Sequence, residues 1–378
     1  MITSGKINIL HICETSGIGG AETVLYNIVS NLDKRRYNSV VLLYRAGWLY
    51  DRLRDIGIKT IVMADYHSWD IRLFLSIRRA VKDEHIQLIH SHLPDANAHS
   101  SLVGFWVGVP VIVTYHGKII LSPNIFNPAR IKLSIVRKFS SKVVAVSNYL
   151  KNALSQVAGF SSSRIATIYN GIEMSQYETP IDKIAKKKQL GLDPDDKIVG
   201  ITANQRPDKG YEYFVRAAAL INAEMPDVKF LLIGEERSDI KAKLVEELKN
   251  PNFSNNVFFL GFRSDVRELL QIMDVFVLSS ISEGLSIATI EAMASSIPVI
   301  VTRSGGPEEI VIDGETGYLV PIRNEREIAD KAIELLTREE LRAKISTRAK
   351  ECVRAKFNIE SMISNYDSLY QDVLSLKG

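Results

Sequence analysis

The chain has 378 residues, of which 46% are hydrophobic and 24% are charged, values typical of a soluble globular protein of two or three domains. No apolar run reaches the length of about 20 residues that a membrane-spanning helix needs, and the run Ile7–Ile12 is too short for a signal peptide. The two cysteines, Cys13 and Cys352, lie far apart in the sequence, which argues against a disulfide framework and favours a cytoplasmic location.

Charge is unevenly distributed along the chain. Residues 1–180 contain 20 Lys and Arg against 12 Asp and Glu, a net charge of +8, whereas the remainder contains 27 against 32, a net charge of −5. A basic first half indicates an anionic partner. Because the sequence has none of the common nucleic-acid-binding motifs, we expect no nucleic acid partner. We expect instead a lipid-diphosphate acceptor and peripheral contact with the inner face of an anionic membrane.

The first strand, Ile7–Ile12, is followed by a glycine-rich loop that opens a helix to about residue 32. Gly19 and Gly20 in this loop are candidates for a phosphate cradle, and a tight turn without a ligand is the alternative. The loop does not match a dinucleotide-binding fingerprint, because Glu22 occupies a position that needs Gly or Ala. This mismatch argues against an NAD-dependent dehydrogenase.

Strands and helices continue to alternate, as a parallel sheet requires. The amphipathic segment 70–84 predicts a helix that either packs on the sheet or lies on a membrane surface. Segment 118–142 mixes basic and apolar residues, which suits a lipid-linked acceptor or an ordinary loop and packed helix. Ser147 is expected to cap a helix. Further strands are predicted at 39–44, 60–63, 87–91, 111–115, 142–146 and 164–169.

All seven histidines precede residue 117. Ligands of parallel sheets gather at the carboxyl ends of the strands, so we expect His116 and one of His90 and His92 to lie at the same edge. Three histidines suggest zinc, but no carboxylate or cysteine spacing completes a site, and no metal is expected. The remaining histidines are expected on the surface or satisfied in the core: His11, His67, His85 and His99.

Residues 174–195 are polar and are predicted to be an irregular linker. Within them, Asp193-Pro-Asp195 matches a metal-binding D-x-D pattern, but its place before a strand predicts a turn. The alternation then restarts, with strands at 198–202, 229–233, 257–260, 275–278 and 298–301 and helices at 210–222, 238–249 and 264–272. Arg206 and Lys209 lie between the first of these strands and its helix, where two cations can clamp a phosphate.

The segment 279–321 combines a polar turn, a helix predicted from Leu285 to Ala294, a strand and a Gly-Gly loop. Gly284 permits close approach of the backbone, and the amides of Leu285 and Ser286 at the helix start favour an anion such as phosphate. Glu291 is then about 8 Å along the helix axis, a suitable place to accept hydrogen bonds from ribose hydroxyls. Glu283, in the turn, would face the sugar. The alternative is that both carboxylates are solvated.

This segment resembles the signature of the retaining family 4 glycosyltransferases, which have the two-domain GT-B fold. The resemblance extends to further motifs along nearly the whole chain: Gly19–Glu22, Tyr115–Gly117, Val146–Ser147, Asn170–Glu173, Lys209–Gly210 and the final helix. It implies two Rossmann-like, doubly wound α/β domains that face a central cleft. Residues 1–175 would bind the acceptor, residues 196–355 would bind the nucleotide-sugar, and residues 356–378 would form a helix that returns to the N-terminal domain.

The resemblance also implies transfer of a sugar from a nucleotide diphosphate donor, preferably a UDP-sugar, to a glycan or polyprenyl-diphosphate-linked acceptor in surface polysaccharide biosynthesis. No metal or cofactor is implied. His116 and Glu283 would position the donor sugar, and Arg206 and Lys209 would stabilise the departing diphosphate. The family also places donor contacts at positions that match Gly19, Gly20, Phe262, Arg263, Gly284, Leu285, Ser286 and Glu291. The alternatives are a nucleotide-sugar epimerase of the same fold and a non-catalytic nucleotide-sugar-binding protein.

Overall fold

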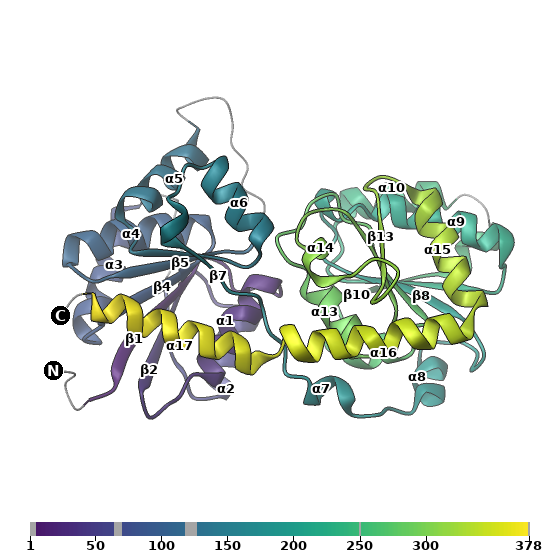
Figure 1. The fold of residues 1–378 in the computed structure, drawn as a ribbon, viewed down its shortest axis with the longest axis horizontal. Coiled ribbons are helices and arrows are strands. Elements are labelled where there is room, and N and C mark those ends of the chain that lie inside the picture. The colour runs from purple at the N-terminus through teal and green to yellow at the C-terminus, as the bar shows by residue number, and fades with distance from the viewer. Residues whose placement is uncertain (1–4, 64–69, 118–126, 249–250, 377–378) are drawn as a thin grey trace. The chain divides into compact units, whose positions relative to one another are not determined.

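A computed structural model describes residues 5–63, 70–117, 127–248 and 251–376. The chain forms two compact units (Figure 1). The first unit contains residues 1–171 together with 359–378, and the second contains residues 172–358. Each unit is built around one parallel β-sheet, and most apolar residues of the inner strands in each are buried, as expected for parallel sheets covered on both faces.

The first unit has a seven-stranded sheet with the order β3-β2-β1-β4-β5-β6-β7. The strand order reverses between β1 and β4, which is where doubly wound folds bind ligands. The strands are β1 (Ile7–Cys13), β2 (Tyr37–Leu43), β3 (Lys59–Val62), β4 (Leu88–His92), β5 (Val111–Tyr115), β6 (Lys142–Ala145) and β7 (Ile165–Thr167).

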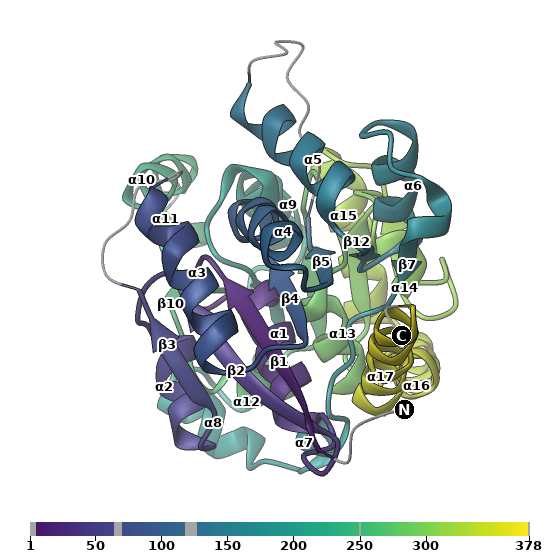
Figure 2. The ribbon, with the colours of Figure 1, turned by 90° about the vertical axis from the view of Figure 1, so that its left-hand side faces the viewer.

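Helices connect these strands, and α3 and α4 lie side by side (Figure 2). Ser147 caps α6 by accepting a hydrogen bond from the Leu150 amide, as predicted. The helices are α1 (Gly20–Asn31), α2 (Trp48–Asp55), α3 (Ile71–Asp83), α4 (Pro94–Val107), α5 (Pro128–Phe139), α6 (Asn148–Gln156) and the short 3₁₀ helix η1 (Ser162–Arg164).

The last helix, α17 (Ile359–Ser375), belongs to the first unit although it follows the second in sequence, so the predicted return of the C-terminal helix is confirmed. Its apolar face buries Tyr366 and Tyr370 completely. The Tyr370 ring meets that of Tyr37 edge to face, and Asp367 pairs with Arg36 at 2.9 Å. These contacts join α17 to the start of β2 within the first unit.

The second unit has a six-stranded sheet with the order β10-β9-β8-β11-β12-β13 and reverses between β8 and β11. Its strands are β8 (Ile198–Thr202), β9 (Lys229–Ile233), β10 (Val257–Gly261), β11 (Val275–Leu278), β12 (Val299–Thr302) and β13 (Tyr318–Val320). Its helices are α7 (Ser175–Glu178), α8 (Lys183–Gln189), η2 (Pro207–Lys209), α9 (Tyr211–Glu224), α10 (Ser238–Glu247), α11 (Pro251–Ser254), α12 (Val266–Gln271), α13 (Ile287–Ala294), α14 (Pro307–Ile310), α15 (Glu325–Thr337) and α16 (Glu339–Lys356).

The prediction of an irregular linker over residues 174–195 is wrong. The segment forms α7 and α8 and contributes three buried side chains, Tyr177, Lys186 and Leu192, to the second unit. Asp182 caps α8 by accepting a hydrogen bond from the Ala185 amide, a local signal that the polar composition of the segment obscured. Asp193–Asp195 lies in a turn before β8, where the Asp193 amide donates to Asp196.

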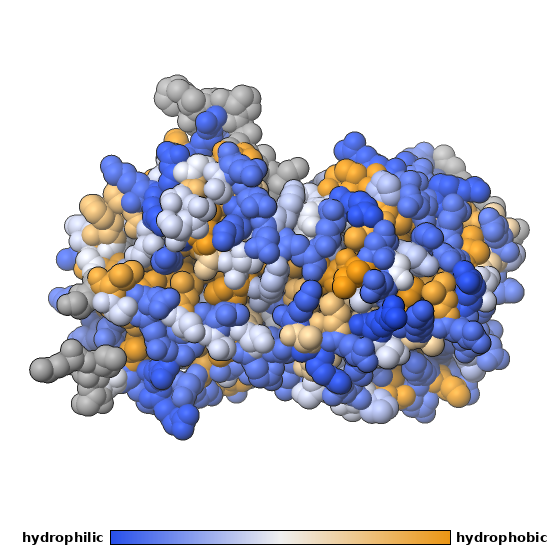
Figure 3. Space-filling view, viewed as in Figure 1, coloured by the Kyte–Doolittle hydropathy of each residue, from blue (hydrophilic) through white to orange (hydrophobic). Residues whose placement is uncertain are grey.

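Residues 118–126 and His67, both considered above, lie outside the described residues. None of the helices in the described part of the chain is long and apolar enough to cross a membrane. On the face shown in Figure 3, apolar surface is scattered among polar surface over both units.

Candidate active site

In the second unit, backbone contacts hold the loops that follow β8 and β11 together. Gly210 has a φ of +61°, and a Cβ at this position would lie 2.2 Å from the Ser279 carbonyl oxygen, so only glycine fits. The Ile281 amide donates to the Asp208 carbonyl at 2.8 Å, and the Ser279 hydroxyl donates to the Lys209 carbonyl at 3.2 Å. Lys209 is thereby fixed beside the turn after β11.

Lys209 and Glu283, predicted from separate motifs, form an ion pair in which Nζ lies 2.6 Å from Oε1. The Ser280 hydroxyl donates to the same carboxylate oxygen at 2.7 Å. Only 13% of the Lys209 side chain and 8% of the Glu283 side chain are exposed. Each charge therefore depends on the other for compensation in a poorly solvated place.

The Gly-Gly loop after β12 fixes the backbone of the same turn. A Cβ on Gly306 would lie 2.1 Å from the Gly284 carbonyl oxygen. The Gly306 amide donates to the Glu283 carbonyl at 3.1 Å, and the Glu283 amide donates to the Ser304 carbonyl at 2.9 Å. Three strand ends thus meet around Glu283 and Gly284.

The helix after this turn, α13, begins at Ile287 and not at Leu285 as predicted. Ser286 is its cap, because the Ser286 hydroxyl accepts the Thr289 amide at 3.2 Å. Four residues separate the helix start from Glu291, so the axial separation is about 6 Å, shorter than the 8 Å expected from the sequence. The amides and dipole at the start of α13 still favour an anion there.

Glu291 is held by a residue that sequence reasoning missed. The Tyr177 hydroxyl of α7 donates to Glu291 Oε1 at 2.7 Å. Burial raises the pKa of Glu291, and the Tyr177 hydrogen bond and the positive charge of Arg267 oppose that rise. The sequence signal that could have indicated Tyr177 was an aromatic residue within the mostly polar segment 174–195.

The turn after β10 contains Phe262 and Arg263, the two residues predicted near the base. The Phe262 side chain is 48% exposed and available for stacking. Arg263 is engaged with Asp265 through two hydrogen bonds of 2.8 and 2.6 Å. Lys186 also pairs with Asp265, and these contacts hold the pKa of Asp265 well below its usual range. Arg263 thus pairs with the residue that precedes α12, and its contact with the base stays a prediction.

Arg206, the other predicted cation, remains exposed. Its side chain is 58% accessible, and its guanidinium lies 3.9 Å from the Asp208 carboxylate. The structure brings Lys209 and Glu283 together but does not place Arg206 in that ion pair.

In the first unit, His116 follows β5 and its Nε2 lies 3.0 Å from Nδ1 of His92, the last residue of β4. Burial lowers the pKa of His116 to about 4, so the ring is neutral near pH 7. His90 points elsewhere: its two ring nitrogens meet the Tyr370 hydroxyl at 2.7 Å and the Thr114 hydroxyl at 2.8 Å. His92 is therefore the histidine that accompanies His116.

Ring nitrogens of His11, His90 and His92 lie within 4.8 Å of one another. A metal would have to replace one of the two hydrogen bonds of His90. Metal binding would thus compete with the hydrogen bonds of His90, and the absence of a metal from the reaction stays a prediction.

The glycine-rich loop accommodates an acidic side chain. Gly19 caps α1 and Gly20 begins it, and a Cβ on Gly19 would lie 2.7 Å from Glu22 Oε2. Glu22 is buried and accepts the Thr15 hydroxyl at 2.6 Å. A side chain at position 19 would thus require the Glu22 carboxylate to move, and the phosphate contact of Gly19 and Gly20 stays a prediction.

Glu14, at the end of β1, is a second residue that sequence reasoning missed. It accepts the amides of Asp95 and Ala96 at 2.6 and 3.0 Å, at the start of α4. Burial and the Asp95 charge raise the pKa of Glu14 to about 7. A single acidic residue directly after the first strand was the available signal.

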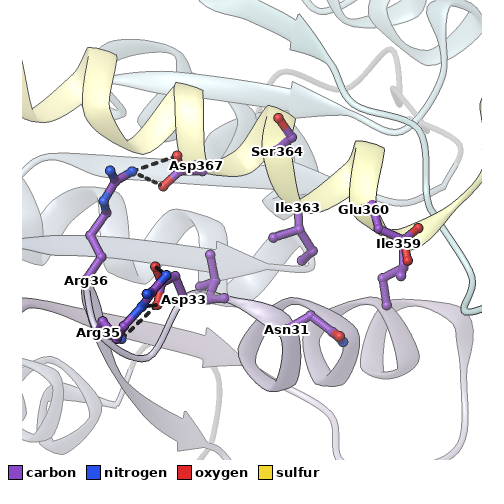
Figure 4. A pocket seen from close by; sticks show the side chains of 10 residues that line it. Asn31, Asp33, Arg35, Arg36, Ile359, Glu360, Ile363, Ser364 and Asp367 are labelled. Carbon is purple, nitrogen blue, oxygen red and sulfur yellow. Dashed lines mark hydrogen bonds and ion pairs between the residues drawn. The ribbon is translucent and has the colours of Figure 1, made fainter.

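Two surface pockets are lined by residues other than those predicted for the site. One, of about 500 Å³, lies between α1 and α17 and is lined by Asn31, Arg36 and Asp367 among others (Figure 4). The other, of about 550 Å³, lies between α7 and α12 and includes Arg267. Neither contains a residue predicted to bind the donor.

Comparison with known proteins accounts for nearly the whole chain. Residues 18–176 match the family described as Glycosyltransferase Family 4, and residues 182–352 match Glycosyl transferases group 1. A glycosyltransferase of Methanocaldococcus jannaschii is 30% identical over 94% of this chain and 95% of its own length. The chain belongs to the family 4 glycosyltransferases of GT-B fold.

Two further relatives of this glycosyltransferase have more specific names. N-acetyl-alpha-D-glucosaminyl L-malate synthase of Bacillus anthracis is 29% identical over 98% of both chains. UDP-Gal:alpha-D-GlcNAc-diphosphoundecaprenol alpha-1,3-galactosyltransferase of Escherichia coli is 24% identical, also over 98% of both. Among solved structures, Anabaena HepE with UDP-glucose superposes with a TM-score of 0.87 at 24% identity, over 97% of this chain and all of that one, which supports the fold.

Proposed function

We propose that this glycosyltransferase moves a sugar from a UDP-sugar to a hydroxyl of a glycan or polyprenyl-diphosphate-linked acceptor, with retention of the anomeric configuration. The observation that carries the proposal is one strand–turn–helix segment with Glu283 paired to Lys209 at its turn and Glu291 inside its helix. Support for the donor comes from the UDP-galactose named for the E. coli relative and the UDP-glucose in the HepE structure. Support for a lipid-linked acceptor comes from the diphosphoundecaprenol in the same relative's name.

In the proposed reaction, the bond between the sugar C1 and the diphosphate oxygen breaks, and negative charge develops on the departing UDP. In this proposal Lys209 and the first amides of α13 stabilise that charge, as a cation and the positive end of a helix dipole can. The acceptor hydroxyl attacks C1 from the face that the diphosphate leaves, and its proton passes to a departing phosphate oxygen. Glu283 holds the sugar hydroxyls, and Glu291 accepts the ribose hydroxyls. The donor-sugar contact assigned to His116 stays a prediction.

Retention is supported by the relatives' names, since both the malate synthase and the galactosyltransferase are named for α-linked sugars. An α-linked product is what retaining transfer from an α-linked UDP-sugar would give. Nothing in the described residues suggests a covalent nucleophile at Glu283, because the charge of Glu283 is compensated by Lys209 and Ser280.

A donor panel tests the proposal. UDP-glucose, UDP-galactose, their N-acetylated forms and GDP-mannose are each incubated with the enzyme and a polyprenyl-diphosphate-linked sugar, and the product is analysed by NMR. The proposal predicts an α-linked product from one UDP-sugar, and formation of this product at least about a hundredfold slower with Lys209→Met. A β-linked product, or a preference for GDP-mannose, would contradict it. Conversion of the donor alone to an epimer would favour the epimerase alternative.

Membrane contact is a second part of the proposed function, and it concerns one surface of the first unit. Ile71, Leu75, Phe105 and Trp106 are between 48% and 68% exposed. Arg78 of α3 lies over the Trp106 ring of α4, at 5.2 Å from its centroid, which joins the two helices into one surface. Exposed apolar side chains among basic residues suit an anionic bilayer interface, where the acceptor lipid would be held.

Cosedimentation with vesicles tests the membrane contact. Binding is predicted to vesicles that contain phosphatidylglycerol, to fall at high salt, and to be lost in a Phe105→Ser/Trp106→Ser variant. A matched variant on the second unit, Val245→Ser, also removes an exposed apolar side chain, 52% accessible, and should bind as the parent does. Equal binding to neutral vesicles, or no effect of the first variant, would refute the assignment.

A further inference from the structure

We propose that Tyr177 is a positioning residue for the ribose-binding carboxylate of Glu291 and thereby helps to select a ribonucleotide donor. The inference rests on the proposed function, since it requires Glu291 to contact the ribose. It concerns a residue outside every motif identified in the sequence, in a segment predicted to be an irregular linker.

The contact between the two residues is short and sheltered. The Tyr177 hydroxyl donates to Glu291 Oε1 at 2.7 Å, and Tyr177 is only 7% exposed. The guanidinium of Arg267 on α12 lies over the Tyr177 ring, 5.5 Å from its centroid. Helix α7 packs against α13, so the position of the hydroxyl is set by the fold.

The Tyr177 hydroxyl, bound to one carboxylate oxygen, determines how Glu291 is oriented and which of its acceptor sites remain available to a ligand. An ionised carboxylate has two oxygens and about four acceptor sites, of which Tyr177 occupies one on Oε1. The remaining sites can accept two ribose hydroxyls at once. The hydrogen bond also favours the ionised form, which burial opposes at this place. Without the hydroxyl, the carboxylate would be free to turn and would accept the two ribose hydroxyls less well.

The effect should appear in recognition of the ribose and not in the fold as a whole. A hydrogen bond to a charged group is stronger than one between neutral groups, and part of its loss would appear as weaker binding of the ligand. We therefore expect Tyr177→Phe to weaken UDP binding about tenfold. A nucleotide without the 2′-hydroxyl donates one hydrogen bond fewer to Glu291. The same substitution should therefore weaken binding of 2′-deoxy-UDP by about threefold or less.

Calorimetric titration of UDP and 2′-deoxy-UDP into the full-length enzyme, Tyr177→Phe, Glu291→Gln and the double variant tests the inference. We expect the unsubstituted enzyme to prefer UDP, Tyr177→Phe to reduce that preference, and Tyr177→Phe to have no further effect once Glu291 is Gln. The matched control is Tyr318→Phe, since Tyr318 also faces a carboxylate of the second unit, that of Glu334, outside the candidate site. Tyr318→Phe should bind both nucleotides normally.

The outcomes separate this inference from the function on which it rests. If Glu291→Gln abolishes the preference for UDP while Tyr177→Phe leaves it intact, the ribose role of Glu291 stands and the positioning role of Tyr177 is wrong. An equal loss of both nucleotides in Tyr177→Phe, additive with Glu291→Gln, would also refute it. If the unsubstituted enzyme does not distinguish the nucleotides and Glu291→Gln binds normally, the ribose role itself fails, and this inference fails with it.

Discussion

Replacing Lys209 with Met should damage both the stability and the activity of the enzyme, and a second substitution should separate the two effects. Lys209→Met keeps most of the side-chain volume but removes the ammonium that compensates Glu283. The Glu283 side chain, 8% exposed, would retain only the Ser280 hydroxyl as a partner.

The expected cost follows from this burial. Removing one partner of a buried ion pair typically costs about 3–5 kcal/mol, because the other charge is left uncompensated. In a domain of roughly 190 residues, each kcal/mol lowers the unfolding midpoint by about 2–4 °C, so a decrease of about 6–20 °C is expected. If Lys209 also stabilises the departing diphosphate, turnover should fall about 10²–10³-fold.

The double variant Lys209→Met/Glu283→Gln removes both charges and should recover much of the lost stability. It should not recover turnover, since the cation that faces the diphosphate is still missing. Thermal unfolding and steady-state transfer are measured on the two single variants, the double variant and the parent enzyme. Arg206→Met is the control, because its 58% exposed side chain makes no buried pair, and it should leave the midpoint within about 2 °C of the parent.

Strictly additive losses of stability in the double variant would show that the pair is not coupled and would refute the structural reasoning. Full recovery of turnover in the double variant would refute the catalytic role of Lys209, since activity would then have depended only on the fold.

Three further predictions concern other parts of the molecule. Phe262→Ala should weaken UDP binding about 5–100-fold in calorimetry while Phe262→Trp binds nearly normally, because the exposed ring is proposed to stack on the base; equal affinity of all three proteins would contradict this. Dialysis against a chelator should leave transfer unchanged, and loss of activity that zinc or magnesium restores would contradict the metal-independent proposal. Burial lowers the pKa of His11 to about 3 and the pKa of His116 to about 4, so the unfolded chain binds more protons than the folded chain between about pH 6.5 and pH 4. The free energy of unfolding should therefore fall as the pH is lowered through this window, by up to about 1.4 kcal/mol per pH unit for each of the two histidines. His116→Gln should reduce that slope in denaturant titrations, and a slope of zero in the parent would show that these rings are not held neutral by burial.

Much of the fold could be predicted because its signals are local. Apolar strand segments such as Ile198–Thr202 and Val275–Leu278 are bounded by turn residues and coincide with β8 and β11. The segment 174–195 could not be predicted in the same way. Its helices depend on tertiary contacts, in which Tyr177 packs against α13 and Lys186 pairs with acidic residues of α12 and the turn before it. Composition alone indicated only polarity.

In the candidate site, too, features with a local sequence signal could be predicted, and features that depend on tertiary contacts could not. Lys209 and Glu283 could each be proposed from a strand end, but their ion pair depends on the backbone approach at Gly210, which no spacing encodes. The helix start was misplaced by two residues because the apolar Leu285 fits the helical period while Ser286 is the cap. The pairing of Arg263 with Asp265 was likewise not indicated by any motif, and the ligand contact predicted for Arg263 stays a prediction.

The most direct test of the central claim is a crystal structure of the enzyme with UDP. The account predicts that the ribose hydroxyls lie within hydrogen-bonding distance of Glu291 and that the diphosphate lies beside Lys209 and the first amides of α13. A nucleotide bound away from Glu291, or a diphosphate remote from Lys209, would contradict it.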